Sequence, residues 1–127
     1  GVLYGTTNIN MLGNSGANAL YGSDGNNILW ALDGNDRLNG RAGEDTLYGG
    51  GGADTFVFEH GAGRDFIGDF QNGVDKIDLS AFGLTWSDLT YRFQQAGNDA
   101  WFQLQTGEVI VINNFQVSQF DPSDFIL

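Results

Sequence analysis

Oxygen-bearing side chains recur at a fixed interval through the first half of this chain. An amide or a carboxylate stands at every ninth residue, at Asn18, Asn27, Asp36, Asp45 and Asp54. A glycine lies two residues before each of them, at Gly16, Gly25, Gly34, Gly43 and Gly52. An apolar residue lies two residues after each, at Leu20, Leu29, Leu38, Leu47 and Phe56. Oxygen ligands spaced evenly among glycines are suited to hard divalent cations such as Ca²⁺.

The spacing defines a series of nonapeptides, whose positions we number one to nine. Repeats one to five begin at Gly13, Gly22, Ala31, Gly40 and Gly49. With short insertions, residues 60–68 and 70–78 continue the pattern as repeats six and seven, and residues 5–12 are an eroded copy. A period this regular is typical of a repeat architecture and disfavours a flexible glycine-rich linker.

Each position of the nonapeptide has a structural reason. Position eight is the only reliably apolar one, which predicts a strand of about three residues with one inward side chain. Positions one to six then form a turn, where glycine permits left-handed backbone angles and close approach of neighbouring turns. Stacked turns direct backbone carbonyls and position-six side chains into the gap between them. Ca²⁺ prefers such all-oxygen sites, whereas softer metals need His or Cys.

The composition agrees with a cation-binding module that is not an enzyme. Acids outnumber bases 16 to 5 among 127 residues, and the net charge of −11 disfavours nucleic acid and anionic membranes. Cysteine is absent and His60 is the only histidine, which argues against disulfides, zinc sites and a Ser-His-Asp triad. No apolar run is long enough to insert into a membrane. Because the chain lacks an initiator Met and a signal peptide, we expect it to be a piece of a longer protein.

Two stretches of the sequence carry a family resemblance. GRAGEDTLY and GGGGADTFV resemble the GGxGxDxUx nonapeptide of RTX (repeats-in-toxin) proteins. GGADTFVF, followed by DFIGDFQNGVDKIDLSAFG, is similar to the segment after the repeats in serralysin-type metalloproteases and to the R-modules of mannuronan C5-epimerases. The resemblance covers nearly all of residues 5–83. It implies a parallel β-roll in which two nonapeptides make one turn and Ca²⁺ lies between repeat n and repeat n+2.

The resemblance also implies a ligand set for each gap. The first repeat of a pair supplies the carbonyls of positions two and four, the second those of positions one and three, and both supply their position-six side chains. Repeats three and five then give a site made of Leu32, Gly34, Asp36, Gly49, Gly51 and Asp54. Repeats two and four give Ser23, Gly25, Asn27, Gly40, Ala42 and Asp45. Repeats one and three give Asn14, Gly16, Asn18, Ala31, Asp33 and Asp36.

Some residues depart from the family pattern. Asn18 and Asn27 keep an oxygen ligand but lose a charge, so we expect weaker binding at the sites that contain them. Insertions disturb the register near Asp65 and Asp75, which we interpret as metal ligands or capping residues. We expect about three to five Ca²⁺ ions in all, with dissociation constants of about 10⁻⁴–10⁻³ M.

The expected fold is all-β, with a parallel β-roll over residues 1–83 and an antiparallel C-terminal cap over residues 84–127. Within the cap, residues 85–88 predict a capped helical turn, and four strands are expected at 89–94, 100–104, 109–113 and 125–127. One outer face of the roll is too apolar for water, so we expect residues 84–127 or a neighbouring domain to cover it. That face carries Ile28, Trp30, Thr46, Tyr48 and Phe66.

The functional hypothesis follows from the repeats and the resemblance. We expect a monomeric calcium-binding module that folds outside a Gram-negative bacterium and supports the type I secretion and stability of an attached enzyme. Its expected partners are an N-terminal catalytic domain of the same protein and the type I secretion apparatus, whose signals the terminal Asp-Phe-Ile-Leu resembles. The alternative is an accessory module that binds an extracellular, alginate-like polysaccharide, with sugars stacking on Trp30 and Tyr48.

Overall fold

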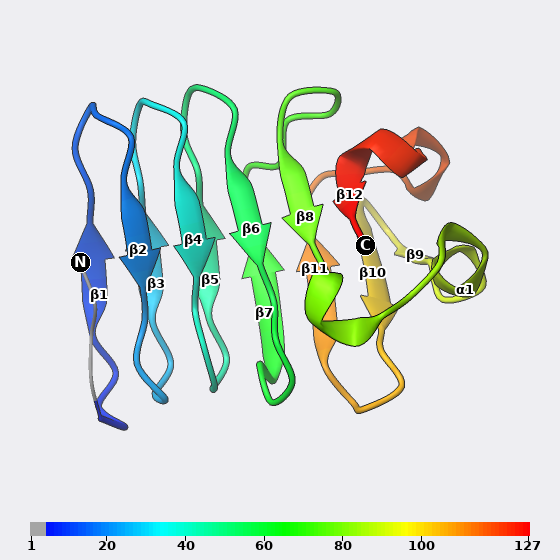
Figure 1. The fold of residues 1–127 in the computed structure, drawn as a ribbon, viewed down its shortest axis with the longest axis horizontal. Helices are drawn as coiled ribbons and strands as arrows, with labels where there is room; N and C mark the ends of the chain where they lie inside the picture. The colour runs from blue at the N-terminus through cyan, green and yellow to red at the C-terminus, as the bar shows by residue number, and fades with distance from the viewer. Residues whose placement is uncertain (1–4) are drawn as a thin grey trace.

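The position-eight side chains form the axis around which the chain winds. In the computed structural model, which describes residues 5–127, each repeat contributes one short strand, and successive strands alternate between two sheets (Figure 1). The five-stranded sheet has the order β12-β8-β6-β4-β2, and the seven-stranded sheet has the order β1-β3-β5-β7-β11-β10-β9. The predicted roll includes residues 1–4, which lie outside the described part of the chain.

The strands of the roll are as short as the repeat predicts. The five-stranded sheet takes β2 (Ala19–Tyr21), β4 (Arg37–Asn39), β6 (Thr55–Val57) and β8 (Lys76–Asp78). The seven-stranded sheet takes β1 (Asn10–Leu12), β3 (Ile28–Trp30), β5 (Thr46–Tyr48) and β7 (Arg64–Ile67). All have three residues except β7, which has four.

Neighbouring strands come from repeats n and n+2 and pair in parallel register. Leu29 lies between Met11 and Leu47 in one sheet, and Leu38 lies between Leu20 and Phe56 in the other. Leu29, Leu38 and Leu47 are fully buried, as are Phe56, Ile67 and Ile77 further along the roll. The predicted parallel β-roll, with one inward side chain per repeat, is confirmed.

Residues beyond the repeats close one end of the roll. After the short 3-10 helix η1 (Ser80–Phe82), α1 (Trp86–Thr90) begins at a capping box formed by Thr85 and Asp88. The strand β10 (Asp99–Gln103) pairs antiparallel with both β9 (Gln94–Ala96) and β11 (Val109–Ile112). The 3-10 helices η2 (Val117–Gln119) and η3 (Pro122–Asp124) lead to β12 (Phe125–Ile126). No helix among residues 5–127 is long and apolar enough to span a membrane.

The cap is only partly antiparallel, because it joins the roll through parallel pairs. β11 pairs in parallel with β7, and β12 pairs in parallel with β8. These pairings satisfy the backbone groups that the last strand of each roll sheet would otherwise expose. Four aromatic rings, those of Phe93, Phe102, Phe120 and Phe125, pack together beneath these strands. The division of the chain at residue 83 stays a prediction.

The C-terminal residues extend the apolar outer face instead of covering it. Val111 pairs with Phe66 at the edge of the roll, and Trp101 pairs with Val111 in turn. The expectation that residues 84–127 pack over this face is therefore wrong, since edge pairing of β11 with β7 places them in the same sheet. Trp30 remains 37% exposed and stacks on Tyr48, with ring centroids 5.9 Å apart.

A truncation in the central column tests the stacking. Leu47→Ala should lower the free energy of unfolding by about 2–5 kcal/mol, because the flanking strands cannot collapse into the space that it leaves. Leu12→Ala is the matched control, since Leu12 is 67% exposed at the end of the sheet. Urea unfolding under conditions in which the parent chain is folded measures both changes. Equal losses in the two variants would contradict the in-register core.

Candidate metal centre

The position-six side chains lie in two columns, one along each edge of the roll. Repeats one, three, five and seven form one column, and repeats two, four and six form the other. Each aspartate in a column accepts a hydrogen bond, through Oδ1, from the backbone N–H of position six in the preceding turn. The distances are 2.6 Å for Asn18–Asp36, 2.7 Å for Asn27–Asp45, and 2.9 Å for Asp36–Asp54, Asp45–Asp65 and Asp54–Asp75. One carboxylate oxygen is thereby fixed between two turns.

The second carboxylate oxygen of three aspartates has no partner. Oδ2 of Asp36, Asp45 and Asp54 is buried and makes no hydrogen bond. A buried acceptor left unpaired costs about 1–3 kcal/mol, and more when it is charged. Each of the three predicted sites contains one of these aspartates as the position-six ligand of its second repeat. A cation that binds oxygen is the partner that would satisfy them.

Backbone carbonyls converge on the same gaps between turns. The carbonyl of Leu32 points so closely at Gly50 that a Cβ there would collide with it, and the carbonyl of Gly34 faces Gly52 in the same way. Similar approaches, each from a carbonyl to a glycine of the next turn, occur in Gly16–Gly34, Gly25–Gly43 and Gly43–Gly63. The glycines at position four therefore keep side chains out of the gaps.

The opposite wall of each gap brings position one close to position six. A Cβ at Gly22 would meet both Oδ1 of Asn27 and the carbonyl oxygen of Gly40. A Cβ at Gly13 would likewise meet Oδ1 of Asn18 and the carbonyl oxygen of Ala31. The structure thus brings together oxygen atoms from different repeats that the family resemblance places in the same sites.

The other predicted ligands lie in the same turns. Oδ2 of Asp54 lies against Gly49, and Asp33 forms an isolated parallel bridge with Gly51. The turns also contain Asn14, Ser23 and Ala42. Asp65 and Asp75 are each 1% exposed and occupy position six in the two columns despite the insertions before them. The assignment of all these residues as ligands stays a prediction.

Asp69 lies outside the nonapeptide pattern but next to the candidate site. It belongs to an insertion between repeats six and seven, yet its carboxylate accepts hydrogen bonds from the backbone N–H groups of Gly49 and Gly50, at 2.9 and 2.8 Å. An acidic residue in a short insertion between two repeats was the only available signal. Asp69 caps the start of the turn that also contains Asp54.

The donor set fits calcium and does not fit a softer metal. Among residues 5–127, no group of three or more His, Asp or Glu side chains is placed to hold a metal ion. Each gap brings together at most two position-six side chains, and backbone carbonyls provide the other oxygen atoms. Carbonyl-rich sites with few carboxylates are typical of Ca²⁺, which accepts six to eight oxygen ligands.

Burial raises the pKa of several of these carboxyl groups. Desolvation raises the pKa of Asp45 and Asp54 from 3.8 to about 7 and that of Asp65 to about 8, against the opposing effect of backbone hydrogen bonds. Neighbouring acids raise the pKa of Asp54 further, with Asp75 the largest contributor among them. A bound divalent cation would favour the ionised forms and remove this penalty.

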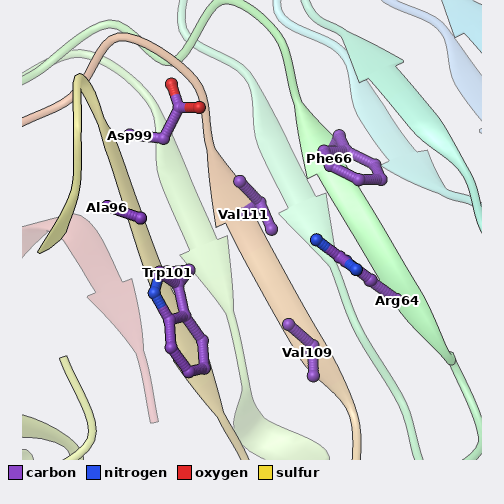
Figure 2. A pocket seen from close by; sticks show the side chains of 7 residues that line it. All are labelled: Arg64, Phe66, Ala96, Asp99, Trp101, Val109 and Val111. Carbon is purple, nitrogen blue, oxygen red and sulfur yellow. The ribbon is translucent and has the colours of Figure 1, made fainter. Parts of the chain in front are cut away.

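A second feature lies on the outer face of the seven-stranded sheet. A groove of about 350 Å³ runs between β7 and the β9–β10 hairpin, with Val109 and Val111 between its walls (Figure 2). Trp101 lies on one side, and on the other the guanidinium of Arg64 is 5.4 Å from the ring centroid of Phe66. Within residues 5–127, the guanidinium of Arg64 forms no hydrogen bond or ion pair.

Comparison with protein families gives a match to the repeats. The model of the RTX calcium-binding nonapeptide repeat, which spans four copies, matches residues 12–47, 21–56 and 32–67. A comparison with curated protein sequences gave no match.

Several solved structures share the fold. The AlgE6R3 subunit of the Azotobacter vinelandii mannuronan C5-epimerase is 24% identical, with a TM-score of 0.75 over 96% of this chain and 80% of that one. The AlgE6R2 subunit of the same enzyme is 22% identical, with a TM-score of 0.66 over 100% and 92%. The extracellular lipase LipA of Serratia marcescens is 20% identical, with a TM-score of 0.74 over 91% of this chain but 20% of the lipase.

The raised carboxyl pKa values predict an unusual dependence of the metal-free chain on pH. An unfolded aspartate loses its proton near its ordinary pKa of 3.8, whereas folded Asp45 and Asp54 hold theirs up to about pH 7. Between these values the folded state binds more protons, so its stability falls as the pH rises. Far-UV circular dichroism in excess chelator should therefore show more ordered chain at pH 5 than at pH 8. An ordered fraction that rises with pH in chelator would contradict this assignment.

Proposed function

We propose that this chain is a module that folds on binding Ca²⁺ outside the cell, since residues 12–67 match the model of the RTX calcium-binding nonapeptide repeat. Its role is to support the type I secretion and the stability of an attached extracellular enzyme, and the module itself is not catalytic. The observation that most directly supports the proposal is the set of buried, unpaired Oδ2 atoms on Asp36, Asp45 and Asp54.

The balance of forces explains why Ca²⁺ would control folding. The roll buries about one apolar side chain per nonapeptide, and its edges hold two columns of buried carboxylates. Without a cation, desolvation and mutual repulsion of these groups oppose a thin core. Ions that bind only the folded chain add free energy of folding by mass action. Dissociation constants of extracellular calcium modules, about 10⁻⁴–10⁻³ M, would leave the chain unfolded in a compartment with little free Ca²⁺.

The proposed ions lie between turns of the same edge. Three sites use Asp36, Asp45 and Asp54 as described above, and Asp65 and Asp75 would complete two more gaps, for about three to five ions in total. Of the three sites, the one between repeats three and five is the strongest, because it alone has aspartate at both of its position-six residues. The sites of repeats one and two have an amide in place of one carboxylate.

A calcium titration followed by far-UV circular dichroism tests this function. We expect a cooperative transition to β-structure near millimolar Ca²⁺, with no such transition in Mg²⁺, which demands smaller octahedral sites. Asp54→Asn should raise the calcium concentration at half-transition by about tenfold, because it removes a charged ligand. Glu59→Gln, which removes an exposed charge away from position six, should leave the midpoint unchanged. A parent chain that is fully folded in excess chelator would refute the proposal.

A second candidate function is polysaccharide binding. The groove in Figure 2 and the Trp30–Tyr48 stack lie on one outer face, where aromatic rings and an unpaired Arg64 suit a sugar chain with carboxylates. Trp101→Ala and Arg64→Gln should each weaken binding of the Ca²⁺-loaded chain to alginate by tenfold or more in affinity electrophoresis, an estimate of about 1.4 kcal/mol per contact. Tyr91→Ala is the control, because Tyr91 is 88% exposed on the far end of the cap. No retardation of the parent chain would exclude this function for alginate.

A further inference from the structure

Positions one to six of each nonapeptide form one turn, which we number after its repeat. Turns one to five fall into two classes that differ in backbone conformation. In turns three, four and five, positions two and four both have positive φ, as at Leu32 (77°) with Gly34 (116°) and Arg41 (73°) with Gly43 (104°). In turns one and two, neither position has a positive φ. The first class strains its non-glycine residues at position two, since the left-handed region disfavours side chains such as that of Leu32.

Turns one and two are closed by their own side chains. In turn two, Oδ1 of Asn27 accepts the Ser23 N–H at 2.7 Å, while Oγ of Ser23 accepts the Gly25 N–H at 3.1 Å. Nδ2 of Asn27 donates to the same Oγ at 3.0 Å. In turn one, Asn14 and Asn18 make the corresponding three bonds, at 2.9, 2.8 and 3.0 Å. An acceptor side chain at position two and an amide at position six thus form a clamp within a single turn.

Turn two also bridges, without a carboxylate, the gap to residues 5–12, which precede it in the same column. Oγ of Ser23 donates to the carbonyl of Thr7 at 3.0 Å, and Nδ2 of Asn27 donates to the carbonyl of Ile9 at 2.8 Å. Ser23 and Asn27 are 0% and 1% exposed. Their hydrogens occupy carbonyl lone pairs that a cation would otherwise need, so this gap does not fit Ca²⁺.

Turns three to five lack the groups for such a clamp. Leu32 and Gly50 have no acceptor side chain at position two, and the side chain of Arg41 offers only donors. Asp at position six has no N–H to donate, and its Oδ2 is left unpaired in all three turns. The identity of two residues per turn therefore separates the turns that satisfy their own polar groups from those that do not.

We propose that turns one and two form a calcium-independent start of the roll, and that the need for calcium begins at turn three. This inference rests on the proposed calcium-dependent folding and deepens it, because it states which turns the ion controls. The clamped turns also hold Oδ1 of Asn18 and Asn27 against the next gap before any ion binds. The ligands that turns one and two supply to the sites of repeats one and three and of repeats two and four are then in position before the ion binds.

The sequence supplies a matched pair for a reciprocal graft. Turns two and three share Asp-Gly-Asn at positions three to five, at residues 24–26 and 33–35, and differ at positions two and six. Leu32→Ser with Asp36→Asn gives turn three the clamp of turn two. Ser23→Leu with Asn27→Asp removes the clamp from turn two.

Folding of these variants in excess chelator, driven by trimethylamine N-oxide and followed by far-UV circular dichroism, provides the test, since this osmolyte favours compact states. The Leu32→Ser/Asp36→Asn variant should need less osmolyte than the parent chain. Its folded-to-unfolded ratio should rise by about tenfold at fixed osmolyte, the effect of pairing one buried polar group. The reciprocal Ser23→Leu/Asn27→Asp variant should need more osmolyte for half-folding in chelator.

Single variants separate the clamp from a simple loss of charge. Asp36→Asn alone should gain less than the double variant, because Leu32 offers its amide no acceptor. Asn98→Asp, in an exposed turn of the cap, is the charge control for Asn27→Asp. The proposal is overturned if the double variant needs as much osmolyte as Asp36→Asn alone, or stays unfolded throughout the titration.

Failure of the broader function is visible in the same data. A parent chain that is folded in chelator and insensitive to Ca²⁺ would refute calcium-dependent folding. Urea unfolding in chelator would then replace the osmolyte titration. The clamp would still be supported if the double variant were more stable than Asp36→Asn alone, and overturned if it were not.

Discussion

A carboxylate oxygen that is buried without a partner is the constraint on which this structure depends. The β-roll requires one polar side chain per turn at position six, because the hydrogen-bond ladder between turns needs an acceptor there. Aspartate meets that requirement with one oxygen and leaves the other unpaired in turns three to five. The ladder that aligns the turns therefore creates the electrostatic problem that a cation solves, and the same residues specify both the register and the metal chemistry.

The apolar core is too narrow to compensate for that problem. In a stack of two-strand coils, each coil contacts only its neighbours. Its stability is therefore close to a sum of local terms along one dimension. Position eight contributes one buried side chain to each strand, whereas the aromatic cluster of Phe93, Phe102, Phe120 and Phe125 is concentrated at the C-terminal end. The central turns hold the buried carboxylates of Asp36, Asp45 and Asp54 and lie away from this aromatic cluster.

How much the sequence predicts depends on whether the signal is periodic. Leu29, Leu38 and Leu47 recur every nine residues, and this period predicts short strands and the inward column. The alternation of strands between two sheets is what the resemblance to RTX repeats implies. The parallel pairing of β11 with β7 has no periodic signal, because it joins residues more than 40 positions apart through the free edge of a sheet. The nine-residue period does not assign a role to Asp69, because this residue lies in an insertion. The period also does not predict the role of the Ser23 hydroxyl, because residue types vary at position two. This hydroxyl nevertheless closes the turn through its hydrogen bonds.

Polar groups at the two ends of the roll find hydrogen-bond partners within the protein, whereas carboxylate oxygens in its middle do not. At the N-terminal end, amide and hydroxyl groups close turns one and two, and in turn two they also donate to the carbonyls of Thr7 and Ile9. At the C-terminal end, β11 and β12 pair with the last strands of both sheets. In a one-dimensional stack, unstable central turns prevent the stable ends from folding cooperatively with each other. Ions that bind only the central gaps would then decide whether the ends belong to one cooperative unit, which makes the position of the aspartates as important as their number.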